Sequence, residues 1–126
     1  MTNIAEQQPT HLVRTDTSPD GVAVAAVVGV VDMASYQELA SALGALAESR
    51  PTGLVLDLRG VAFLGSIGIA VLVNTQHAAR RLGVAFAVVA DNRSVLRPLL
   101  AARVEQVLPV HPGLDEALAA VRLATT

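Results

Sequence analysis

Apolar residues recur along the chain in two patterns, and these predict strands and helices in turn. Apolar, β-branched runs predict strands, and apolar residues three or four positions apart predict helices. The predicted strands cover residues 11–17, 22–31, 54–58, 84–90 and 107–110. The predicted helices cover residues 34–49, a segment from just after Ser66 to Arg81, a segment from Asp91 or Asn92 to about Ala102, and residues 112–123. We expect Gly83 to end the second helix and Pro98 to shorten or bend the third.

The order of these elements predicts one mixed α/β domain. Ser18-Pro19-Asp20-Gly21 carries turn residues, so the first two strands should form a hairpin. Strands and helices then alternate, which is typical of a parallel sheet. We expect one domain over residues 11–124, with a mixed sheet of four to five strands and about four helices. The preceding residues, 1–10, predict a flexible lead without the apolar core of a signal peptide.

Composition narrows the classes of protein. Hydrophobic residues make up 52% of the 126 residues and aromatic residues 2%, so we expect an aliphatic core with Phe63 and Phe86 as its large rings. The net charge of -2 argues against nucleic acid as a partner. The chain has no cysteine, which excludes disulfides and thiolate sites and fits the cytoplasm. The longest apolar runs, residues 21–31 and 61–73, are too short for membrane insertion.

Ser66 is a polar residue within the apolar stretch VAFLGSIGIAVLV, residues 61–73. It lies where a predicted strand meets a predicted helix, and sites in α/β sheets collect at such junctions. One interpretation is a helix N-cap. Another is an acceptor of phosphate, which the positive end of a helix favours. Gly65 and Gly68 would leave the hydroxyl accessible in either case.

The sequence offers little support for catalysis. The nucleophile elbow G-x-S-x-G fails because Leu64 stands two residues before Ser66. His11, His77 and His111 are scattered and suggest surface positions rather than a triad. Phosphate-binding loops, dinucleotide motifs and metal-ligand spacings are absent from the sequence. We therefore expect no catalytic residue, no metal and no cofactor. A small serine hydrolase is kept as a third hypothesis, after the two that are stated at the end of this section.

Residues 54–73, LVLDLRGVAFLGSIGIAVLV, resemble the signature of the STAS domain, the family of bacterial anti-sigma factor antagonists. That signature is commonly written D-L-S-x-V-x-F-x-D-S-S-G-L. Residues 29–32 resemble the family's earlier G-E-L-D segment, and residues 84–90 and 93–100 resemble its later strand and helix. The resemblance covers about residues 11–124 and implies a small α/β regulatory domain rather than an enzyme.

The resemblance also implies a function. Such a domain binds an anti-sigma factor of the serine-kinase type and thereby releases a sigma factor. The kinase uses ATP and Mg²⁺ to phosphorylate the serine that matches Ser66, which ejects the antagonist, and a phosphatase restores it. By the same resemblance the partner-binding surface comprises Asp32, Gly65, Ser66, Ile67, Gly68, Arg93 and Arg97.

Three positions depart from the family pattern. Gly65 replaces the usual Asp, Ile67 replaces a Ser, and Val30 replaces a Glu. The leading hypothesis is a cytoplasmic partner-switching regulator that phosphorylation at Ser66 turns off. The alternative is a STAS scaffold or accessory subunit of a transport or signalling complex that never accepts phosphate.

Three of the predicted partner-binding residues also have structural interpretations. Asp32, together with Ser35, could cap the helix that follows it. Arg93 and Arg97 could form a solvated helix face.

Overall fold

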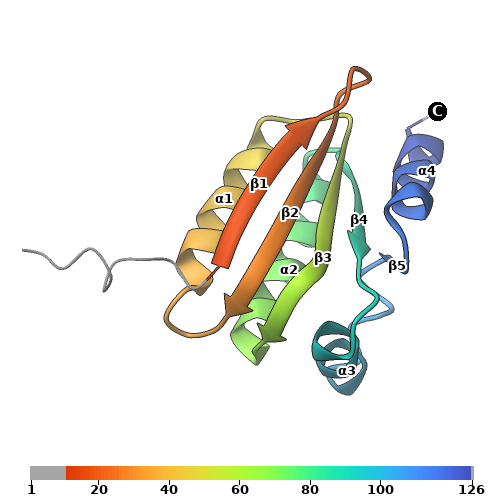
Figure 1. Ribbon diagram of the computed structural model, residues 1–126. Helices are drawn as coiled ribbons and strands as arrows, with labels where there is room; N and C mark the ends of the chain where they lie inside the picture. Colours follow the sequence, from red (N-terminus) through yellow and green to blue (C-terminus); the bar gives the residue numbers. More distant parts are fainter. Residues whose placement is uncertain (1–10, 126) are drawn as a thin grey trace, which may run out of the picture.

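The computed structural model describes residues 11–125, so the predicted flexible lead over residues 1–10 lies outside the described part of the chain. Within it, strands and helices follow each other in the predicted order (Figure 1). The elements are β1 (His11–Thr17), β2 (Val22–Val31), α1 (Tyr36–Glu48), β3 (Gly53–Leu64), α2 (Ser66–Arg81), β4 (Ala85–Val89), α3 (Arg93–Ala101), β5 (Val110–His111) and α4 (Leu114–Ala124). No helix within this part of the chain is long and apolar enough to cross a membrane.

The strands form one sheet in the order β1-β2-β3-β4-β5. β1 pairs antiparallel with β2, and all later neighbours pair in parallel. Because crossovers between parallel strands are right-handed, a sheet that grows in one direction receives its crossover helices on one face. α1, α2 and α3 pack on that face, and α4 packs on the other against β3 and β4 (Figure 1). The predicted mixed α/β fold is confirmed.

Successive side chains of β3 point to opposite faces of the sheet and therefore belong to two separate apolar cores. Leu54 and Leu56 face the helices α1, α2 and α3 and are fully buried. Val55 faces α4, where it packs in one cluster with Val121. A Cβ atom on Gly53 would lie 1.9 Å from Cγ1 of Val121, so only a glycine lets α4 cross the start of β3 at this separation.

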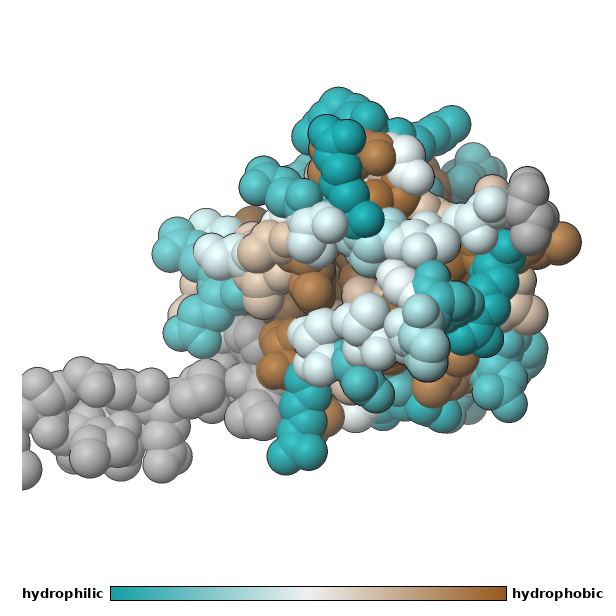
Figure 2. Space-filling model, turned by 90° about the horizontal axis from the view of Figure 1, so that it is seen from above, coloured by the Kyte–Doolittle hydropathy of each residue, from teal (hydrophilic) through white to brown (hydrophobic). Residues whose placement is uncertain are grey.

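The β1–β2 hairpin is tight, as its turn residues predict. The N–H of Ser18 donates to the carbonyl of Val22 at 2.9 Å, and the N–H of Gly21 donates to the carbonyl of Ser18 at 2.9 Å. Gly21 has a φ of +88°, which favours glycine at the end of the turn. An ion pair at 2.8 Å between Asp20 and Arg122 fastens the hairpin tip to α4. Hydrophilic side chains border most of this end of the molecule, with apolar ones between them (Figure 2).

β3 runs further than predicted, to Leu64 rather than to residue 58. Its pairing with β2 shifts register twice, between Ala26 and Val28 and again between Gly29 and Val30. Each shift changes which face the following side chains reach. The expectation that Phe63 belongs to the core is wrong, because its ring lies on the outside and is 52% exposed. Phe86 is buried, as predicted.

The remaining differences concern short elements. β5 comprises only Val110–His111, whereas the prediction was residues 107–110. α3 has nine residues and contains Pro98, and Asn92 precedes it without a side-chain cap. Gly83 follows α2 with a φ of +73°, which confirms it as the terminator.

Two helical glycines provide a matched test of packing between α2 and the sheet. A Cβ atom on Gly68 would lie 2.7 Å from Cδ1 of Leu64 and 2.9 Å from Cγ1 of Val31, whereas one on Gly44 in α1 would meet no atom within 4 Å. We expect Gly68→Ala to lower the free energy of unfolding by about 1–2 kcal/mol through overpacking. Gly44→Ala should raise it by about 0.5–1 kcal/mol, because alanine restricts the unfolded chain. Urea denaturation measures both, and equal effects of the two variants would contradict this close packing.

Candidate partner-binding surface

Ser66 is the first residue of α2 and is exposed at the end of the helix. The residue in the N-cap position is Gly65, whose φ of -77° and ψ of 169° are extended. The N-cap interpretation of Ser66 is therefore wrong by one position. Among the described residues the Ser66 hydroxyl has no hydrogen-bond partner. The hydroxyl is consequently free to meet another molecule.

The first turn of α2 is fastened to the end of β2. The N–H of Gly65 donates to the carbonyl of Val31 at 3.0 Å, and the N–H of Ile69 donates to the carbonyl of Gly65 at 3.1 Å. Gly68 is buried against Val31, where it brings the helix close to the strand. Gly68 thus supports the surface by positioning α2 and not by its own exposure.

Asp32 and Ser35 order the loop that leads from β2 into α1. The Asp32 carboxylate accepts hydrogen bonds from the N–H of Ala34 at 3.0 Å and from the Ser35 hydroxyl at 3.1 Å. The Ser35 oxygen accepts in turn from the N–H of Asp32 at 3.1 Å. Ser35 occupies the N-cap position of α1, but its side chain makes no capping bond. The two residues therefore shape the loop before α1. Asp32 directly follows Val31, whose carbonyl accepts the hydrogen bond from Gly65, so this loop begins beside the start of α2.

Three exposed apolar side chains lie in β2, in the loop that follows it and near the end of β3. We call Val28, Met33 and Phe63 the apolar rim; they are 54%, 75% and 52% exposed. A Cβ atom on Gly65 would lie 3.3 Å from the Phe63 ring, so the ring borders the residue before Ser66. Sequence reasoning missed the apolar rim, although Gly29 and Gly60 beside it are a usual signal for bulges in a strand.

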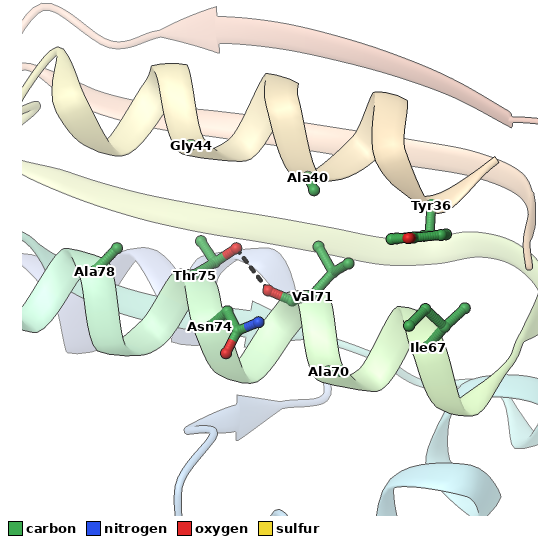
Figure 3. A pocket seen from close by; sticks show the side chains of 9 residues that line it. All are labelled: Tyr36, Ala40, Gly44, Ile67, Ala70, Val71, Asn74, Thr75 and Ala78. Atoms are coloured by element: carbon green, nitrogen blue, oxygen red, sulfur yellow. Dashed lines mark hydrogen bonds between the residues drawn. The ribbon is translucent and has the colours of Figure 1, made fainter. Parts of the chain in front are cut away.

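A groove between α1 and α2 begins beside Ser66. Its volume is about 220 Å³, and its lining is mostly small and apolar. Tyr36 and Ile67 stand opposite each other at one end, as Figure 3 shows. Further along, the Thr75 hydroxyl donates to the carbonyl of Val71 at 2.8 Å, so this buried polar group is satisfied within its own helix. At position 67, where the family pattern has a second serine, this chain thus has an isoleucine that lines the groove.

α3 is attached to the same end of the sheet. The side chains of Asn92 and Ser94 donate to the carbonyl of Val61 at 2.7 and 2.9 Å. This places the start of α3 near the carboxyl ends of β2 and β3 (Figure 1). Arg93 and Arg97 are exposed and form no salt bridge within residues 11–125. They remain predicted partner contacts.

Asp57 and Arg59 form an ion pair on β3, on the face opposite α1 and α2. The guanidinium donates to both carboxylate oxygens, at 2.9 and 2.8 Å. These hydrogen bonds from Arg59 hold the pKa of the Asp57 carboxyl below its usual value, although partial burial acts in the opposite direction. The pair contributes local order to β3 upstream of Ser66.

The described residues around Ser66 form a candidate binding surface. An exposed hydroxyl stands at a helix start, the Phe63 ring lies close to the residue before it, and the residue after it lines the groove. Within residues 11–125 there is no group of three or more histidine, aspartate or glutamate residues that could hold a metal ion. Exposed apolar side chains beside an exposed hydroxyl are typical of a surface that binds another protein.

Comparisons with known proteins identify the family. The model of the STAS domain matches residues 15–117, and the chain belongs to that family. The anti-sigma-F factor antagonist RsfB of Mycobacterium tuberculosis is 33% identical over 116 residues, which cover 90% of this chain and 93% of that protein.

Solved structures agree with this assignment. An anti-sigma factor antagonist from Mycobacterium paratuberculosis is 36% identical and superimposes with a TM-score of 0.83 over 89% of this chain and 94% of its own. The Bacillus cell fate determinant SpoIIAA in its phosphorylated form has the same fold, with a TM-score of 0.66 at 10% identity. That match covers 88% of this chain and all of the other.

The Asp57–Arg59 ion pair predicts that the free energy of unfolding depends on pH. Because the folded-state pKa of Asp57 is depressed, its contribution to stability is present above the unfolded value of about 3.9 and is lost as the pH falls through the folded value. We expect Asp57→Asn to lower the free energy of unfolding at pH 7 by less than about 1 kcal/mol, since the arginine is partly exposed. The difference should shrink below about pH 4. Denaturant unfolding at both pH values measures it, with the exposed Glu105→Gln as control; a difference that persists in acid would contradict the ion pair.

Proposed function

We propose that this protein is an anti-sigma factor antagonist that binds an anti-sigma factor of the serine-kinase type, releases a sigma factor and is switched off by phosphorylation at Ser66. The observation that carries the proposal is the exposed, unpartnered hydroxyl of Ser66 at the first position of α2. Family membership and the antagonist relatives over nine-tenths of the chain support it.

The start of α2 suits a phosphate. The N–H groups of the first helical turn have no partner within a helix, and the positive end of the helix dipole favours an anion. The intrahelical ladder begins with the N–H of Ile69, which leaves those of Ser66, Ile67 and Gly68 available. A phosphate on Ser66 would therefore be stabilised by the backbone and would leave the fold intact.

The surroundings of Ser66 make such a phosphate disruptive to an interface. The apolar rim would be desolvated on binding, and a group carrying about -1.5 to -2 charges beside it resists desolvation. Gly65 and Ile67 contribute no charge, and the carboxylate of Asp32 is engaged in its own loop. Phosphorylation would thus place a strong negative charge where the neighbouring residues 65 and 67 carry none.

The alternative function is a STAS scaffold or accessory subunit that is not phosphorylated. The observation that favours it is the same pair of departures, because Gly65 and Ile67 replace the acidic and hydroxyl neighbours of the family pattern. The two functions differ in whether Ser66 accepts phosphate and in whether a charge there changes binding.

Phosphorylation distinguishes the two functions directly. We expect the cognate anti-sigma kinase with ATP and Mg²⁺ to add one phosphate to the wild-type chain, located at Ser66 by mass spectrometry. Ser66→Ala should take up none, and Ser41→Ala, which alters an exposed serine in the middle of α1, should take up as much as the wild type. Ser66→Asp should bind the kinase at least about tenfold more weakly than Ser66→Ala. Absence of phosphate together with equal affinities would favour the scaffold.

The apolar rim gives an independent test of the interface. We expect Phe63→Ser to weaken binding of the anti-sigma factor by about tenfold or more, because an exposed aromatic side chain is a typical anchor. Its thermal unfolding should change little, since the ring is already half exposed. Leu123→Ser, which alters a 76% exposed residue of α4, serves as the control and should bind like the wild type. Calorimetric titration measures the affinities; equal values for both variants would remove the apolar rim from the interface.

A further inference from the structure

β1 forms one edge of the sheet, and no described strand pairs with its outer side (Figure 1). Its residues Arg14, Thr15, Asp16 and Thr17 are all exposed. Natural edge strands usually carry devices that prevent pairing with another chain, such as prolines, bulges or charged side chains. Of these, β1 carries only the charges of Arg14 and Asp16, which are opposite in sign. β1 has no proline and pairs with β2 in one continuous register without a bulge. The edge is therefore a regular template for another strand.

The direction of the free backbone groups follows from the hairpin. The N–H of Ser18 donates to the carbonyl of Val22, so these residues form a hydrogen-bonded pair. Hydrogen-bonded and non-hydrogen-bonded pairs alternate along an antiparallel ladder. Asp16 with Val24 and Arg14 with Ala26 are thus hydrogen-bonded to β2. The backbone N–H and C=O groups of Val13, Thr15 and Thr17 point away from the sheet, toward the open edge.

The side chains of β1 are complementary to those of a second, antiparallel copy of β1 in one particular register. An antiparallel pair centred on Thr15 would place Thr15 opposite Thr15 of the second copy, and Val13 opposite its Thr17. All outward-pointing backbone groups of these residues would then be paired. The same register would place Arg14 opposite Asp16 of the second copy and Asp16 opposite its Arg14, which gives two ion pairs related by symmetry. Moving the centre by two residues in either direction would keep the backbone bonds but lose the charge match.

Neither Arg14 nor Asp16 is paired with an opposite charge within the described domain. Among residues 11–125, Arg14 and Asp16 form no salt bridge. Both lie on the face of β1 opposite the α1 side, because their partners Ala26 and Val24 alternate with the buried Ala25 and Ala23 that face α1 and α2. Opposite side chains in non-hydrogen-bonded antiparallel pairs lie close together. The geometry therefore permits direct contact of each arginine with the facing aspartate.

We propose that this protein forms a two-fold symmetric dimer through antiparallel pairing of β1 with β1 of a second copy, centred on Thr15. The pairing would join the two sheets into one continuous sheet. A contact made by one short strand from each copy is small, so the dimer should be weak and should depend on protein concentration. Ser66 is the first residue of α2, after β3, and β2 separates β3 from the edge strand β1, so the pairing would not involve the start of α2.

A charge-reversal experiment tests the proposal with the full chain. Wild-type protein should show a monomer–dimer equilibrium in sedimentation velocity between about 10 µM and 1 mM, the range expected of a small interface. Arg14→Asp and Asp16→Arg should each weaken association at least about tenfold, because like charges would face each other in both pairs. The double variant Arg14→Asp/Asp16→Arg should associate like the wild type. Mixing the two single variants should produce a heterodimer, since each would then supply the charge that the other needs.

Two further variants separate the edge from other surfaces. Thr15→Pro removes an N–H that points to the open edge and leaves the ladder to β2 intact, so it should abolish association without loss of the folded circular dichroism spectrum. Arg81→Asp reverses an exposed charge at the end of α2 and should associate like the wild type. A wild-type chain that stays monomeric up to 1 mM would overturn the proposal. Failure of the two single variants to associate when mixed would also overturn it, and so would a dimer that Phe63→Ser abolishes while both charge reversals leave it unchanged.

Discussion

The hydrogen bond from the N–H of Gly65 to the carbonyl of Val31 is the contact on which the geometry of the surface depends. It joins the last residue of β2 to the residue before α2, so two loops that are far apart in the sequence take one fixed arrangement. Gly68 allows this bond by removing the side chain that would hold the helix away from Val31. Because β2 satisfies the N–H of Gly65, the N–H groups that remain free belong to residues from Ser66 onward. The position of the serine and the donors around it are consequences of the same contact.

Much of the fold follows from the pattern of apolar residues. β1 and β2 match the predicted ranges, and α2 ends at Arg81 before Gly83 as expected. These elements are long, and strong turn or terminator residues bound them. β5 was misplaced because a two-residue strand carries no periodicity of its own, and its pairing with Val88 and Val89 decides where it lies. Tertiary context outweighs local pattern in such short elements.

The surface was less predictable than the fold. The location of Ser66 at a strand–helix junction is evident from the sequence, whereas the exact cap is not, since the extended backbone of Gly65 moves the helix start by one residue. The exposure of Phe63 depends on two register shifts between β2 and β3, and a strict alternation of faces cannot show them. The role of Asp32 within its loop likewise depends on where Ser35 lies in space. Each of these features depends on backbone geometry that residue types alone do not specify.

The attachment of α4 has a consequence for synthesis on the ribosome. The ion pair that fastens it joins Asp20 to Arg122, residues separated by 102 positions, and its apolar face completes the cluster around Val55. Domains emerge from their amino-terminal end, so α4 becomes available after α1, α2 and α3. Until then Val55 and its neighbours on β3 and β4 lack their cover, whereas the core facing α1 and α2 can already form. The nascent chain therefore passes through a stage in which one face of its sheet is finished and the other is open to chaperones or to aggregation.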